Sequence, residues 1–188
     1  VVVGTGTAHD DLTSFYASIP VEMKQVAGYF GKDALRQVDE NLFYQSIPAL
    51  RRQVSDRAIL RAMHFFDDNA RVPAMVAALQ KGDLDTFFKG SIASGESSWM
   101  LLQNVYALAS DESLALALAL SRKLLENRGG AWRVHGGGFA GTIQAFVPHT
   151  LMEQYVKTLC AAFGPQACNV LAIRPVGATE VLFEGRLN

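Results

Sequence analysis

The amino-acid sequence predicts an α+β fold, in which an antiparallel sheet is covered by helices on one side. Strand-like runs rich in β-branched and aromatic residues stand near both ends of the chain, and segments with helical periodicity fill the middle. The order of the expected elements is one strand, a block of helices, two strands, one helix and two strands. A glycine-rich stretch between two neighbouring strand-like runs indicates a hairpin.

The chain opens with residues 1–5, which predict a short buried strand closed by glycines. The first long helix is expected to begin at Pro20, because proline has no N–H group to leave unsatisfied in a first helical turn. It should run to Phe30 and end at Gly31, a residue type that favours the left-handed conformation after a helix. A second helix is expected over residues 41–53.

The next helix has clear start and stop signals. Ser55 is a suitable N-cap, and Asp56 in the first turn complements the helix dipole. Pro73 lies inside the periodic pattern and predicts a kink or an end near Arg71. The apolar stripe that this helix is expected to bury consists of Ile59, Ala62, Met63, Phe66 and Ala70.

The second half of the chain alternates helices and strands. Gly82 should end the preceding helix, and Asp83 should cap another through residue 92, followed by a polar, less regular segment at 91–99. An alanine- and leucine-rich helix is expected over 111–127, and the hairpin strands over 131–134 and 142–147. Thr150 and Glu153 form a capping-box pair for a helix that ends at Gly164. Strands at 169–173 and 180–183 should close the fold.

Length and composition indicate one globular domain, with 188 residues of which 49% are apolar. Seventeen basic and eighteen acidic residues give a net charge of −1, so no electrostatic argument favours nucleic acid or an anionic membrane as partner. No apolar run reaches a membrane-spanning length, and no signal peptide is recognised. Two cysteines, Cys160 and Cys168, suit a reducing cytoplasm. Because the chain opens on Val1 without an initiator methionine, we expect a piece of a longer protein.

The most informative stretch is the glycine loop, residues 135–141, which contains Gly136, Gly137, Gly138 and Gly141. Glycine enters positive φ without a Cβ penalty, and consecutive free N–H groups can form an anion-binding concavity. The alternative is a hairpin turn that happens to be glycine-rich. A dinucleotide-binding loop is excluded because a strand rather than a helix follows. A protein-kinase loop is excluded because the sequence has neither H-R-D nor D-F-G.

Residues 133–141, Arg-Val-His-Gly-Gly-Gly-Phe-Ala-Gly, resemble the third conserved motif of the GHMP small-molecule kinases in its galactokinase form, Arg-Met-Thr-Gly-Gly-Gly-Phe-Gly-Gly. Further fragments resemble galactokinase motifs in the family's order and at similar spacing. They are His9 with Leu12, Tyr16 and Glu22; Leu35-Arg36-x-Val38; Arg61-x-x-His64-x-x-x-Asp68-Asn69-x-Arg71-Val72; Asp85 to Ser97; and Pro175-x-Gly177-Ala178. Together they identify the chain as similar to galactokinases over nearly all of its length.

The resemblance implies a GHMP-kinase C-terminal domain, a two-layer ferredoxin-like structure that spans residues 1–188. The family's sugar signature, its phosphate loop and its catalytic aspartate do not occur in this chain. We therefore expect the C-terminal half of an enzyme that uses ATP to phosphorylate the anomeric hydroxyl of galactose. ATP and magnesium would be bound mainly by the N-terminal half, the partner of this segment, and the isolated segment would be inactive.

The sequence also departs from the galactokinase pattern. Ile19-Pro20 stands in place of paired arginines, Gly95 in place of a histidine and Ile92 in place of an asparagine. In the loop, His135 and Ala140 replace threonine and glycine. These changes leave open a kinase for a related amino sugar, and a sugar-binding regulatory relative without turnover.

Several residues are candidates for the functional site. The resemblance places Tyr16 at the sugar; the alternative is a half-buried packing residue. It places Gly136, Gly137, Gly138, Phe139 and Gly141 beside the phosphate loop of the other half and near ATP and sugar. His135 is a weaker candidate for a phosphate contact.

Other reactive side chains lack the context that catalysis or metal binding requires. His9, His64 and His149 show no metal-ligand spacing, so no metal site is expected. Ser94, Ser97 and Ser98 lie in no nucleophile motif and have no evident partner base. Asp68 and Arg71, three residues apart, are expected to form a surface or helix-packing pair.

Overall fold

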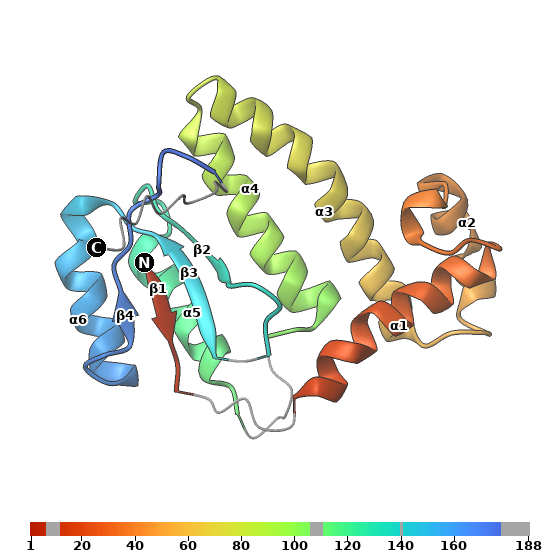
Figure 1. Ribbon diagram of the computed structural model, residues 1–188, viewed down its shortest axis with the longest axis horizontal. Helices are drawn as coiled ribbons and strands as arrows, with labels where there is room; N and C mark the ends of the chain where they lie inside the picture. Colours follow the sequence, from red (N-terminus) through yellow and green to blue (C-terminus); the bar gives the residue numbers. More distant parts are fainter. Residues whose placement is uncertain (7–11, 106–110, 140, 178–188) are drawn as a thin grey trace, which may run out of the picture.

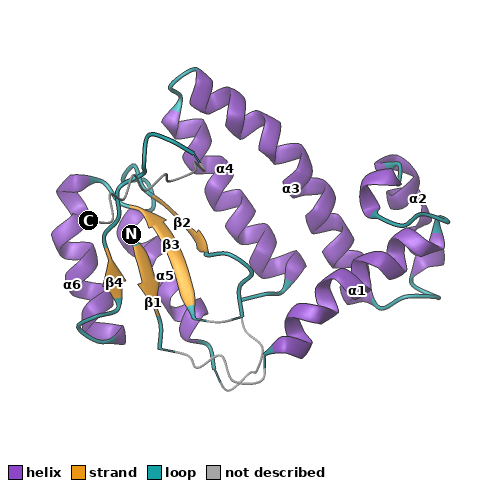
Figure 2. Ribbon diagram, viewed as in Figure 1, coloured by secondary structure: helices purple, strands orange, loops and turns teal. Residues whose placement is uncertain are grey.

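The computed structural model describes residues 1–6, 12–105, 111–139 and 141–177 (Figure 1). It combines four strands with six α-helices, which confirms the α+β prediction (Figure 2). The strands are β1 (Val2–Gly4), β2 (Ala131–Val134), β3 (Thr142–Phe146) and β4 (Cys168–Asn169). The helices are α1 (Thr13–Tyr29), α2 (Glu40–Leu50), α3 (Asp56–Gln80), α4 (Leu84–Ser97), α5 (Ser113–Leu125) and α6 (Met152–Phe163).

The strands form one antiparallel sheet in the order β2-β3-β1-β4. Ile143 is the partner of both Val134 and Val3, so these three side chains share one face of the sheet. All three are fully buried, and helices α5 and α6 cover this face (Figure 1). The expected antiparallel sheet covered by helices is therefore present, but helices are not confined to one side, because Phe88 of α4 covers Phe146 on the opposite face.

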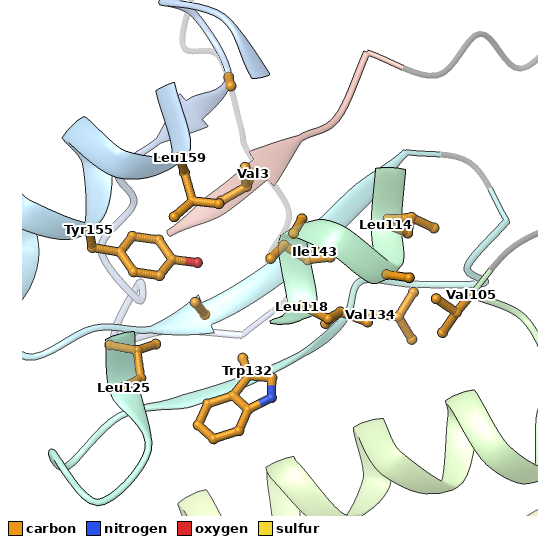
Figure 3. Close-up of a cluster of buried hydrophobic side chains, with 14 residues drawn as sticks. Val3, Val105, Leu114, Leu118, Leu125, Trp132, Val134, Ile143, Tyr155 and Leu159 are labelled. Carbon is orange, nitrogen blue, oxygen red and sulfur yellow. The ribbon is translucent and has the colours of Figure 1, made fainter. Parts of the chain in front are cut away.

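The main core lies between that face and the two helices (Figure 3). Leu118 and Leu125 of α5, Tyr155 and Leu159 of α6, and Trp132 of β2 contribute its large side chains. The hydroxyl of Tyr155 is 2.7 Å from the Ser121 hydroxyl, which satisfies the one polar atom that this ring brings into the core. Burial raises the pKa of Tyr155 to about 12.

A second core occupies the far end of the molecule, where α1, α2 and α3 meet (Figure 1). Phe43 of α2 packs against Phe66 of α3 with ring centroids 5.1 Å apart. The residues buried in this second core are Val26, Ala27, Leu35, Val38, Phe43, Leu50, Ala58, Ile59, Ala62 and Phe66. The described residues thus hold two large apolar clusters and a smaller one around Phe139.

Several helix signals predicted from the sequence are confirmed. The Ser55 hydroxyl accepts a hydrogen bond from the N–H of Ala58, and the Asp83 carboxylate accepts one from the N–H of Thr86. Gly31 and Gly82 follow α1 and α3 with φ of +66° and +69°, the conformation that favours glycine at a helix end.

The helix start expected at Pro20 is wrong, and so is the helix end expected near Arg71, whereas a kink at Pro73 stays a prediction. Helix α1 begins at Thr13, and Pro20 lies inside it; α3 runs on to Gln80 with Pro73 inside. In both cases tertiary packing outweighs the lost backbone hydrogen bond. The first turns of α1 are held by an apolar cluster around Phe139, and the last turns of α3 pack on α4, where Met75 lies against Gly90.

The irregular segment predicted at 91–99 is also wrong, because α4 continues to Ser97 and is followed by a π-helical turn, Ser98–Leu102. Ser91, Ser94, Ser97 and Gly95 are buried. Their small side chains let α4 approach α3 and β2 closely, so their role is packing rather than solvation.

Smaller differences concern element ends. Helix α2 ends at Leu50, and α5 spans only Ser113–Leu125. Strand β4, Cys168–Asn169, shares only Asn169 with the strand expected at 169–173. The capping box is not formed, because Thr150 lies in a 3-10 turn, His149–Leu151, and α6 begins without a side-chain cap. The strand expected at 180–183, with His9, Ala140 and Ala178, lies outside the described residues.

Candidate functional site

The glycine loop joins β2 to β3 at the end of the sheet. Gly136, Gly138 and Gly141 have φ of +65°, +78° and +72°, which explains glycine at these positions. Phe139 has φ of +50°, an uncommon value for a large side chain. Its ring is 4% exposed, so burial holds the backbone in this conformation.

Tyr16, from the first turn of α1, lies against this loop. Its hydroxyl donates a hydrogen bond of 2.5 Å to the carbonyl oxygen of Gly138. Its ring meets that of Phe139 edge to face, with centroids 5.1 Å apart. A Cβ atom on Gly137 would lie 2.9 Å from the Tyr16 ring. The two features singled out separately in the sequence therefore meet in one place, although more than a hundred residues separate them.

The solvent-facing part of the loop is short. His135, Gly136 and Gly137 are exposed, whereas Gly138, Phe139 and Gly141 are buried. The carbonyl oxygen of Gly141 accepts a hydrogen bond from the N–H of Thr5 at 2.7 Å, which fastens the loop to the end of β1. A ligand at this loop can therefore reach residues 135–137 and the half-buried Tyr16.

Asn104 makes hydrogen bonds to the buried side of the glycine loop. It is not among the candidate residues that the sequence predicts. Its side-chain NH2 group donates to the carbonyl oxygen of Gly137 at 3.1 Å. Its main-chain carbonyl oxygen accepts a hydrogen bond from the N–H of Phe139 at 2.6 Å. It follows the π-helical turn and Gln103, which has φ of +58°. No motif marks it, since it follows Gln103 and an apolar run in a segment without a recognised pattern.

Arg61 fixes the segment that carries Asn104. Its guanidinium is 2% exposed and donates to the Leu102 carbonyl oxygen at 3.1 Å, to the Ser18 hydroxyl at 2.8 Å and to the Glu22 carboxylate at 3.0 Å. Burial lowers the pKa of Arg61. The Glu22 carboxylate also accepts from the more exposed Arg57, so the buried Arg61 charge has an ion-pair partner. This network links α3 to α1 and to the π-helical turn.

A second polar network ties α3 to α4. His64 Nδ1 is 2.9 Å from the Ser97 hydroxyl, and its Nε2 is 3.7 Å from the Asp68 carboxylate. The expectation that Ser97 lacks a partner base is therefore wrong. Ser97 and His64 are only 5% and 8% exposed, so this arrangement cannot meet a substrate. Burial lowers the pKa of His64.

Asp68 belongs to the same network and pairs with Arg71, as predicted. It also accepts a hydrogen bond from Ser94 of α4 at 3.1 Å. The pair thus contributes to helix packing.

His135 faces the other side of the sheet from the core. It lines a groove of about 680 Å³ together with Val2, Gln144 and Phe146 of the sheet, and with residues 170–173. Phe146 is covered there by Phe88 of α4, with ring centroids 5.3 Å apart.

Gly95 and Ile92 are the departures from the galactokinase pattern that leave an amino-sugar substrate open. A Cβ on Gly95 would lie 2.8 Å from Arg133 Cβ and 3.2 Å from the Trp132 carbonyl oxygen, so glycine allows α4 to contact β2. Both residues also line a small pocket of about 160 Å³ between α4, α5 and β2. Because these positions serve helix–sheet packing, they give no support to an amino-sugar substrate.

Among the described residues, no three histidine, cysteine, aspartate or glutamate side chains are grouped as a metal site would need. In the same part of the chain, no helix is both long and apolar enough to cross a membrane.

Comparison with known proteins places the chain beside galactokinases. It is 29% identical over 165 residues to a galactokinase of Glaesserella parasuis and 30% identical over 159 residues to one of Haemophilus influenzae. These alignments cover 88% and 85% of this chain but only 41% and 40% of the relatives, so the chain spans about two fifths of their length. No family model matches the chain.

A solved structure is similar as well. The galactokinase of Lactococcus lactis, determined in complex with galactose, superposes with a TM-score of 0.71 at 20% sequence identity. The superposition covers 86% of this chain and 40% of that protein. At this level of identity the likeness shows the fold, and it agrees with the extent of the sequence alignments.

Proposed function

We propose that this chain, a homologue of the galactokinases, is the C-terminal part of an ATP-dependent kinase that phosphorylates the anomeric hydroxyl of galactose. Residues 1–188 would form one domain and supply one wall of the substrate cleft. The similarity to galactokinases, which extends over 85–88% of the chain, supports membership in a sugar-kinase family. The motif order found in the sequence supports the assignment to the C-terminal part.

The observation that carries the proposal is the contact between Tyr16 and the glycine loop. The Tyr16 hydroxyl donates a hydrogen bond to the Gly138 carbonyl oxygen, and the lone pairs of the hydroxyl oxygen remain able to accept a hydrogen bond from a sugar hydroxyl. Beside it, Gly136 and Gly137 are exposed and have no Cβ, so a ligand can approach their backbone closely. A polar acceptor and an accessible backbone edge thus lie side by side.

Phosphoryl transfer demands positioning and charge stabilisation more than covalent chemistry from the protein. In this proposal Tyr16 orients the sugar, and the loop shapes the boundary between sugar and nucleotide. His135 at the loop's exposed end is a candidate donor to a phosphate oxygen of ATP. Correct placement of two substrates is worth several orders of magnitude in rate, which gives a non-catalytic wall a substantial role.

The catalytic base and the phosphate loop would come from the remainder of the protein. Magnesium, which prefers carboxylate and phosphate oxygens, would also be held mainly there. The proposed location is a reducing cytoplasm, since two cysteines are too few for the disulfide framework of a secreted domain.

The test is an assay of the purified full-length protein with ATP and galactose, in which ³¹P NMR follows the formation of an anomeric sugar phosphate. We expect turnover with galactose and none from residues 1–188 alone. Turnover by the isolated chain would refute the division of labour. Galactose binding without turnover, seen by calorimetry, would instead favour a regulatory relative. Faster turnover of an amino sugar than of galactose would show that the amino sugar is the substrate.

A further inference from the structure

Asn104 makes hydrogen bonds on both sides of Gly138. Its side-chain amide donates to the residue before Gly138, and its main-chain carbonyl accepts from the residue after it. A Cβ on Gly138 would overlap the Asn104 carbonyl oxygen and lie 2.6 Å from Nδ2. The loop is therefore in van der Waals contact with Asn104 along three consecutive residues.

The side chain of Asn104 lowers the stability of the fold, because one of its polar atoms is buried without a partner in the described part of the chain. The residue is 1% exposed, and its Oδ1 accepts no hydrogen bond from any residue that the structure describes. A buried polar atom without a partner destabilises the fold, so such atoms are rare and call for an explanation. A leucine has a similar size and shape and would avoid the unsatisfied oxygen. The explanation we favour is that the N–H donor to Gly137 is needed.

We propose that Asn104 is a positioning residue that sets the conformation of the glycine loop and, through it, the place of the substrate beside Tyr16. The inference rests on the proposed sugar-kinase function. The Gly137 carbonyl that Asn104 holds belongs to the residue on which the Tyr16 ring lies, and the Tyr16 hydroxyl is bonded to Gly138. Loss of the Asn104 donor therefore shifts both groups that face the substrate.

The test uses Asn104→Asp in the full-length protein, because this change keeps the shape of the side chain. A protonated carboxyl can donate to the Gly137 carbonyl as the amide does, whereas a carboxylate cannot and repels that oxygen. Burial disfavours the charged carboxylate, so the neutral, hydrogen-bond-donating form of the introduced side chain persists closer to neutral pH than it does in water. We expect kcat/KM of Asn104→Asp, divided by that of the parent at the same pH, to fall roughly tenfold between pH 6 and pH 8.

Two control variants separate positioning from stability. Asn104→Leu has the size without the donor and should be impaired at both pH values, by roughly 10- to 100-fold. Ile59→Val loosens the second core, away from the loop, and should lower the melting temperature without a pH-dependent loss of kcat/KM. A flat ratio for Asn104→Asp, or parental kcat/KM in Asn104→Leu, would overturn the proposal.

Hydrogen exchange of the Phe139 amide gives a readout that does not depend on activity. We expect its protection to fall in Asn104→Leu, and in Asn104→Asp as the pH rises. If the parent phosphorylates no sugar, the proposed function fails, and this measurement alone decides the role of Asn104 in shaping the loop. Unchanged protection in both variants would reject that role even in an active kinase.

Discussion

Gly138 and Gly136 make a matched pair for testing why the loop is made of glycine. Both have positive φ, +78° and +65°, and both would be strained by any side chain. They differ in their surroundings. A Cβ on Gly138 would overlap Asn104, whereas a Cβ on Gly136 would meet nothing within 4 Å. Replacing each by alanine therefore separates backbone strain from steric overlap.

The expected magnitudes follow from these surroundings. Left-handed backbone costs an alanine about 1–2 kcal/mol, which is the full effect predicted for Gly136→Ala. Gly138→Ala adds an overlap with a carbonyl oxygen that is itself held by the Phe139 N–H, and overpacking of this kind costs about 1–3 kcal/mol. The total for Gly138→Ala is about 2–5 kcal/mol, a large part of the stability of an ordinary domain.

The assay is urea unfolding of the full-length protein, with kinase activity measured alongside. Gly138→Ala should lose more stability than Gly136→Ala, and activity should fall with the loop's conformation. Gly136→Ala should remain folded but bind its substrates more weakly, because its side chain would stand in the exposed part of the loop. Equal losses of stability in the two variants would refute the reasoning, since they would show that the Asn104 contact does not constrain Gly138.

Three further predictions concern other residues. Tyr16→Phe should weaken sugar binding roughly 2- to 13-fold with little change for ATP, because one hydrogen bond is worth about 0.5–1.5 kcal/mol, and calorimetry showing equal losses for both ligands would indicate a packing residue. Glu22→Gln leaves the Arg61 guanidinium buried and unpaired, which should cost about 3–5 kcal/mol in urea unfolding, whereas Arg51→Gln at an exposed ion pair should leave stability unchanged. Because burial lowers the pKa of His64, only the unfolded state binds a proton just below the ordinary value of 6.5; the parent should therefore lose stability as the pH falls from 7.5 to 5.5, and His64→Gln should lose less. Equal slopes in the parent and in His64→Gln would show that His64 is as easily protonated in the fold as outside it.

Sequence patterns predicted the hairpin and the caps at Ser55 and Asp83 because those signals are local, although the equally local capping box at Thr150 is not formed. Ser55 and Asp83 bond to N–H groups three residues away, and the loop glycines have the positive φ that their residue type favours. The patterns failed where distant contacts decide the outcome. Pro20 and Pro73 stay helical because other elements pack against the flanking turns.

The candidate site was predicted only in part, for the same reason. The loop and Tyr16 carry motif signals, but their hydrogen bond depends on how α1 packs against the hairpin. Asn104 carries no signal at all, and its importance comes from the π-helical turn and from the buried Arg61 that fixes this turn. The prediction of an irregular segment at 91–99 was wrong because small polar residues, which are typical of loops, also allow close packing between a helix and its neighbours.

The central claim is that Tyr16 and the glycine loop form the sugar-facing wall of a kinase cleft. A crystal structure of the full-length protein with galactose tests it most directly. The account predicts a sugar hydroxyl within hydrogen-bonding distance of the Tyr16 oxygen, with the sugar or nucleotide against Gly136 and Gly137 and Asn104 still bonded to the loop. Galactose bound at a site that touches neither Tyr16 nor residues 135–137 would contradict it.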